Sequence, residues 1–218
     1  MDPFFFGFAL SVFSLFLLLI NAILFLSKIK KFNNPVYKYV AVYLIALFIV
    51  ELFCNIIGYV KPGANFFLSH FYFNAQFILL SAVFYRLFSN QKLKKLVVAN
   101  YIITTLIIAG IYIADNDSFW EFNLFEIAAT SLLLLVYAFI HFYNTLGKKK
   151  SYFYLLIGMV LYVLCSSLIF LFGNYELVFI EDPYIDIWIF NTLFYIIYQV
   201  LIFTEWRFIN KHGLDNEY

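Results

Sequence analysis

Residues 4–26 read FFFGFALSVFSLFLLLINAILFL, a run of 23 residues without a single charge. A helix rises 1.5 Å per residue, so about 20 apolar residues cross the roughly 30 Å hydrocarbon core of a bilayer. The residues before this run contain no basic cluster, and no Ala-x-Ala site follows it. The pattern therefore predicts a first transmembrane helix rather than a cleaved signal peptide.

The whole chain has the same apolar character. Of its 218 residues, 65% are apolar and 12% are charged, and the mean hydropathy is +0.89. A soluble domain needs a surface with roughly 25% charged residues, which this composition cannot supply. We therefore expect the lipid bilayer to surround the protein. We expect no nucleic-acid partner, because no basic patch of the kind that binds nucleic acid is present.

Six further apolar stretches follow the first, and all four prolines lie in their ends or in the loops between them. The sequence therefore predicts an all-α, polytopic integral membrane protein with seven transmembrane helices, forming one domain over residues 1–218. No connecting loop is long enough to form a soluble domain. The predicted helices cover residues 4–27, 39–60, 66–88, 96–114, 122–146, 151–173 and 186–206.

The basic residues predict the orientation of the helices. Thirteen of the fourteen Lys and Arg residues fall on one side of the predicted bundle, and the other side holds only Lys61 together with eight acidic residues. Cytoplasmic loops carry the excess of Lys and Arg. We therefore expect an outer N-terminus, a cytoplasmic C-terminus and, in a bacterium, a multi-pass protein of the inner membrane. The Lys-rich, Arg-poor composition favours a bacterial source.

The longest predicted loop, Asn174 to Asp186, lies on the outer side. Its apolar centre, residues 175–180, is too short to span a bilayer, and we expect it to form a lid or a short interfacial element. Cys54 and Cys165 both fall inside apolar runs, and we interpret them as buried apolar side chains rather than a disulfide or a metal pair.

Polar side chains within the predicted helices are the candidates for function, because a charge at the middle of a membrane helix costs about 3 kcal/mol. Most lie in the outer half, at spacings that place them on shared helix faces. We expect them to line an outward-facing pocket. Glu51 is the leading candidate, since a protonated carboxyl is far less costly to bury than its anion. The set comprises Glu51, Asn55, His70, Asn74, Glu126, Thr130 and Asn191.

A smaller polar group is predicted in the inner half, either as a latch near the cytoplasmic side or as hydrogen bonds between helices. It comprises Tyr137, His141, Asn144 and Gln199. For both groups, hydrogen bonding between helices is the competing explanation.

Three functions fit these residues to different degrees. The leading hypothesis is a non-enzymatic membrane subunit, acting as a receptor-like sensor of a small molecule or as part of a larger complex with membrane protein partners. The alternative is a small proton-coupled or facilitative transporter, favoured by Glu51 and by a three-plus-three arrangement of helices around the fourth. The third is a metal hydrolase, which would need Glu51, His70 and Glu126 as an unusual ligand set. We expect no metal or cofactor, and residues 151–210 contain no lysine for a retinal Schiff base.

Overall fold

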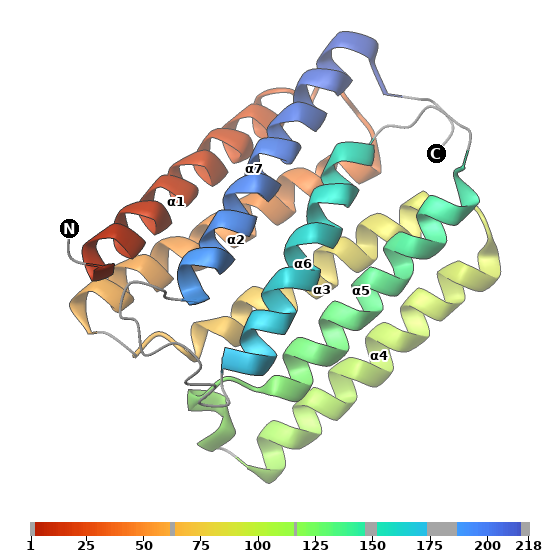
Figure 1. The fold of residues 1–218 in the computed structure, drawn as a ribbon. Helices are drawn as coiled ribbons and strands as arrows, with labels where there is room; N and C mark the ends of the chain where they lie inside the picture. Colours follow the sequence, from red (N-terminus) through yellow and green to blue (C-terminus); the bar gives the residue numbers. More distant parts are fainter. Residues whose placement is uncertain (1–2, 62–63, 116, 147–151, 174–186, 215–218) are drawn as a thin grey trace.

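A computed structural model describes residues 3–61, 64–115, 117–146, 152–173 and 187–214, and these form helices joined by short connections (Figure 1). Among the described residues there are seven α-helices and no strand, which confirms the predicted all-α fold. The helices are α1 (Pro3–Ser27), α2 (Pro35–Val60), α3 (Leu68–Leu87), α4 (Gln91–Ala114), α5 (Leu124–Asn144), α6 (Phe153–Gly173) and α7 (Ile187–His212), with a short 3₁₀ helix, η1 (Asp117–Trp120), before α5.

Helix caps explain where α2 and α4 begin. Asn34 accepts hydrogen bonds from the backbone N–H groups of Val36 and Tyr37, and Asn90 accepts one from that of Lys92. Each cap satisfies N–H groups that have no partner inside the helix. Both helices therefore start four or five residues before the apolar stretch that predicted them, because hydropathy detects the buried span and not the capped first turn.

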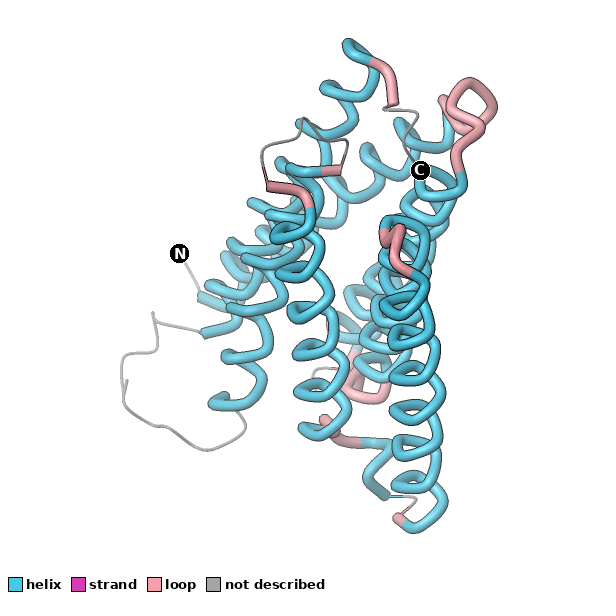
Figure 2. The backbone as a smooth tube through the Cα atoms, turned by 90° about the vertical axis from the view of Figure 1, so that its right-hand side faces the viewer, coloured by secondary structure: helices cyan, strands magenta, loops and turns pink. Residues whose placement is uncertain are grey.

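The helices pack as a closed ring of six, with one helix outside it. Neighbours around the ring are α1, α2, α3, α5, α6 and α7, and α7 packs against α1 to close it. Helix α4 packs on the outside, against α3 and α5 (Figure 1). The view turned by 90° shows the helices running side by side along one long direction (Figure 2).

Six of the seven helices are long and apolar enough to cross a membrane, and α3 falls below that threshold. Helix α3 contacts α2, α4 and α5, and its Ser69, His70, Gln76 and Ser81 are all buried. A helix that faces protein rather than lipid can carry more polar groups, because its neighbours satisfy them. The low hydropathy of α3 therefore follows from its place in the bundle.

Apolar side chains cover the outside of the bundle. On the peripheral α4, for example, Leu106 is 66% exposed and Ile113 is 86% exposed. Exposed apolar residues also occur along the outer faces of the ring, among them Phe16, Leu132 and Val200. An apolar surface of this extent is typical of contact with lipid, and the protein is a multi-pass membrane protein.

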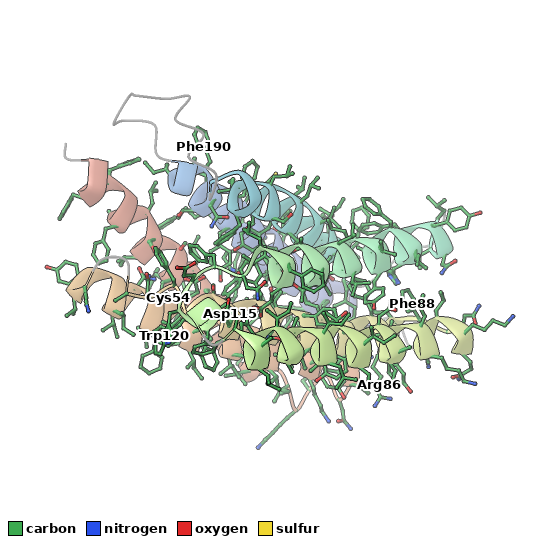
Figure 3. All side chains as sticks on the ribbon, turned by 90° about the horizontal axis from the view of Figure 1, so that it is seen from below. Cys54, Arg86, Phe88, Asp115, Trp120 and Phe190 are labelled. Atoms are coloured by element: carbon green, nitrogen blue, oxygen red, sulfur yellow. The ribbon has the colours of Figure 1, made fainter. Side chains whose placement is uncertain are left out.

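The two ends of the bundle differ in charge. Cys54 and Trp120 lie toward one end, and Arg86 and Phe88 lie toward the other (Figure 3). The connection before α2 and the start of α4 carry most of the described lysines and lie at the Arg86 end, because successive helices reverse direction. The other end, with the start of α1 and the ends of α2, α4 and α6, is the one predicted to face outward; the side of the membrane stays a prediction.

Candidate functional site

A cavity of about 470 Å³ opens at the end of the bundle predicted to be outer. Side chains from α1, α2, α3, α6 and α7 line it, together with residues of the connections before α3 and α5. Small-molecule sites are commonly cavities of roughly 300 to 1,000 Å³ with apolar walls and a few polar groups. The wall consists of Gly7, Phe8, Ser11, Ser14, Glu51, Cys54, Asn55, Gly58, Tyr59, Asn65, Phe66, Ser69, Tyr72, Phe73, Phe122, Tyr162, Phe170, Asn191, Thr192 and Tyr195.

Three residues predicted for the pocket line this cavity: Glu51, Asn55 and Asn191. Asn55 is held in place, because its side-chain oxygen accepts a hydrogen bond of 2.8 Å from Ser11 and its amide donates to the Glu51 backbone oxygen at 2.9 Å. The Asn191 side-chain oxygen is buried and has no hydrogen-bond partner in the described part of the chain. Glu51 makes no side-chain hydrogen bond or ion pair with any described residue.

Tyrosines form the deep wall of the cavity and fill the bundle below it. Tyr72 donates a hydrogen bond of 3.0 Å to the Tyr162 hydroxyl, and Tyr198 donates one of 3.2 Å to the Tyr43 hydroxyl. The Tyr162 ring lies 5.0 Å from that of Tyr195 and stacks on that of Tyr198 at 5.6 Å. We call these five side chains, from α2, α3, α6 and α7, the tyrosine layer; Tyr43 and Tyr198 are completely buried beneath the cavity.

The mouth of the cavity depends on a close approach at Gly58. The Asn65 side-chain amide donates a hydrogen bond of 3.2 Å to the Cys54 backbone oxygen, and a Cβ at Gly58 would lie 3.0 Å from the same amide nitrogen. The glycine therefore lets Asn65 reach across the last turn of α2. This contact closes one side of the opening.

His70, Asn74 and Glu126, also predicted for the pocket, lie outside the cavity and form a separate cluster between α3, α4 and α5. His70 Nδ1 is 2.7 Å from Glu126 Oε2 and 2.7 Å from the Tyr112 hydroxyl. Both the Tyr112 hydroxyl and the Asn74 amide donate close hydrogen bonds to the Glu126 carboxylate. We call these four residues the His70 cluster.

The His70 cluster is satisfied in either protonation state. His70 Nε2 lies 3.0 Å from the Phe119 backbone oxygen, which only accepts, so this nitrogen carries a hydrogen. Nδ1 then either donates to the Glu126 carboxylate as part of an imidazolium, or accepts a hydrogen bond from the neutral acid. Neither arrangement leaves a net charge or an unpartnered ring nitrogen in the bundle.

Aromatic packing encloses this cluster. The Phe119 ring stacks on His70 at 5.2 Å, and the Tyr112 ring meets it edge-on at 5.1 Å. Asn123 caps α5 by accepting from the Glu126 N–H at 3.1 Å, and the Thr130 hydroxyl donates to the Glu126 backbone oxygen at 2.7 Å. These contacts join η1 to the ends of α3, α4 and α5. The cluster therefore has the features of a structural contact.

The predicted inner group is distributed over three places. Tyr137 and His141 are buried beside Phe84 and Phe88. Gln199 lies elsewhere, where its side chain and its backbone oxygen each accept a 2.9 Å hydrogen bond from Asn21 and so join α7 to α1. Asn144 is exposed. These four residues therefore do not form one site.

Glu205 on α7 is a buried carboxylate that the sequence did not single out, and both of its oxygens accept hydrogen bonds. It is 0% exposed and accepts hydrogen bonds from the backbone N–H groups of Tyr152 at 2.5 Å, Tyr154 at 2.9 Å and Leu155 at 3.4 Å. It thus caps the beginning of α6 from another helix. A charge inside the predicted helix was the available signal, but its partners are backbone groups that have no sequence signature.

Two further predictions concern a metal site and a lid. Among them, no three His, Cys, Asp or Glu side chains lie together as a metal site would require, and Glu51 is separated from the pair formed by His70 and Glu126. The predicted lid, residues 174–186, lies outside the described part of the chain.

Comparison with protein-family models, curated proteins and solved structures finds no match.

Proposed function

We propose that this protein is a receptor-like membrane subunit that binds a small molecule in the cavity and passes the resulting change to a membrane protein partner. The observation that carries this proposal is a cavity of ligand size that ends on the tyrosine layer. Such a cavity admits a ligand from one side of the membrane. Because no described segment forms a domain outside the bundle, the output depends on a partner.

The tyrosine layer supplies a route for the signal. Tyr72, Tyr162 and Tyr195 line the cavity; Tyr198 lies below them and stacks on the Tyr162 ring, and Tyr43 accepts a hydrogen bond from Tyr198. A ligand that displaces the upper rings must therefore shift α2, α3, α6 or α7 relative to one another. Close packing transmits such shifts because buried side chains have few alternative arrangements.

The proposal is tested by isolating the protein from its native membrane in mild detergent and identifying the chains that accompany it. We expect a membrane partner to copurify in a fixed ratio and to survive stringent washing. Recovery of this chain by itself, after chemical crosslinking in the intact membrane, would contradict the subunit assignment. Reporter fusions at residue 148 and at the C-terminus test the proposed inner-membrane orientation, for which both reporters must lie on the cytoplasmic side.

A transporter is the second candidate, favoured by Asn21 and Gln199. These two buried polar residues lie on α1 and α7, closer to the Arg86 end than the cavity does, and would continue a polar path if the tyrosine layer opened. Uptake assays in proteoliposomes decide between the two. A transporter predicts uptake that Glu51→Gln alters, whereas a receptor predicts binding without uptake.

A further inference from the structure

The charge inside the cavity points to the chemistry of the ligand. Glu51 is the only Asp, Glu, Lys, Arg or His among the described residues that line the cavity wall. A site with one carboxylate and no basic residue attracts cations and repels anions. Asp115 and Glu121 are exposed at the same end of the bundle and add to this negative field, which Lys61, exposed at the end of α2, offsets only in part.

The surroundings of Glu51 differ from those of the other acidic residues within the helices. Glu126 accepts hydrogen bonds from Tyr112 and Asn74 and pairs with His70, and Glu205 accepts from three backbone N–H groups. Glu51 has neither a hydrogen bond nor an ion pair among the described residues. A half-buried carboxylate without a partner is costly, and a cationic ligand would offset that cost.

The walls fit an organic cation better than a metal ion. Tyr72, Tyr162 and Tyr195 present aromatic rings beside Glu51, and Phe8 and Tyr59 pair at 5.1 Å near the mouth. Aromatic faces attract ammonium groups, and several rings around one site form the usual cage for alkylated ammonium ions. A metal site would usually gather three or more His, Cys, Asp or Glu ligands, and the described residues contain no group of three such side chains.

We propose that the cavity binds a small organic cation, with a protonated or alkylated amine against Glu51 and the tyrosine rings. This proposal rests on the proposed receptor function. Asn191 strengthens the case, because its buried side-chain oxygen has no partner among the described residues and can accept a hydrogen bond from a ligand N–H or O–H group. The cavity volume of about 470 Å³ leaves room for a carbon skeleton attached to the amine.

Cys54 provides a native probe, since it lines the cavity one turn from Glu51. In a Cys165→Ala background reconstituted into nanodiscs, Cys54 is labelled with three methanethiosulfonate reagents that carry a trimethylammonium group, a sulfonate group or an uncharged methyl group. Rates are divided by the rates for a free thiol in solution. We expect the cationic reagent to exceed the anionic one by about tenfold, because the Glu51 carboxylate attracts the cation and repels the anion, and a tenfold ratio corresponds to a total difference of about 1.4 kcal/mol.

Glu51→Gln and the matched control Glu121→Gln locate the source of this preference. Glu51→Gln should reduce the ratio of cationic to anionic labelling to nearly one, while Glu121→Gln, on an exposed residue outside the cavity, should leave most of it. The ratio is taken within each variant, so a general change in thiol reactivity cancels. Choline should slow labelling by the uncharged reagent more than its isostere, in which a tert-butyl group replaces the trimethylammonium group.

The outcomes separate the two proposals. Labelling by the uncharged reagent without a charge preference overturns the cation assignment and leaves the cavity as a binding site for neutral molecules. Equal protection by choline and its isostere has the same consequence. Failure of all three reagents to reach Cys54 means that the cavity is closed to ligands, and this result overturns the receptor proposal as well.

Discussion

Two carboxyl groups, those of Glu126 and Glu51, lie on opposite sides of α3 and differ in their hydrogen bonding. Glu126 is completely buried and shares its oxygens among His70, Tyr112 and Asn74. Glu51 lines a cavity and has no hydrogen-bond or ion-pair partner among the described residues. A satisfied carboxylate stabilises the fold, whereas an unsatisfied one is available to a ligand. The contrast separates structural polar residues from candidate functional ones, and mutations can test it directly.

Glu126→Gln should produce the largest loss of stability. The substitution removes a charge that three side chains share, and breaking a buried pair by changing one partner costs about 3 kcal/mol or more. Equilibrium unfolding in mixed micelles measures the difference. A variant as stable as the wild type would show that the His70 cluster does not hold α3, α4 and α5 together.

Glu205→Gln should destabilise the protein by about 2 kcal/mol. In the wild type, three backbone N–H groups donate to the two carboxylate oxygens, whereas an amide offers them only one acceptor oxygen. The expected damage is local to the beginning of α6. Hydrogen exchange at Tyr154 and Leu155 should accelerate in this variant, and unchanged exchange at these amides would contradict the capping role.

Gly158→Ala should cost about 1 to 2 kcal/mol through overpacking where α6 meets α7. An added Cβ would lie 2.9 Å from Tyr198 Cδ2 and 3.0 Å from Leu201 Cβ. Gly110→Ala is the matched control on α4, because nothing lies within 4 Å of its Cβ position. The same unfolding assay should show a stability for Gly110→Ala equal to or above that of the wild type.

Glu51→Gln should cause no loss of stability, because no described hydrogen bond or ion pair is lost and the amide carries no charge to desolvate. A variant at least as stable as the wild type is the sharpest test of the comparison, since the chemically identical substitution at residue 126 is expected to be severe. A loss at residue 51 as large as that at residue 126 would show that Glu51 is a structural residue.

The sequence predicted the spans well and the grouping of polar residues less well. Apolar stretches located all seven described helices, although α3 is less apolar than a typical membrane span, and helical spacing correctly placed Glu51 with Asn55 on one face and His70 with Asn74 on another. Spacing does not reveal how a helix is rotated about its axis. Helix α3 turns Ser69, Tyr72 and Phe73 to the cavity and His70 toward α5, so one expected pocket became a cavity and a separate cluster.

By itself, the sequence determined that this chain forms membrane helices, because too few charged residues exist to cover a water-exposed surface. It also specified where those helices break, through its polar loops and capping asparagines. Only the tertiary structure decided which polar groups meet. His70 lies 56 residues before Glu126 and 42 before Tyr112, and Glu205 contacts backbone amides about 50 residues away. Such contacts depend on how each helix is rotated and packed against its neighbours, which close packing and hydrogen bonding between helices decide and no local pattern encodes.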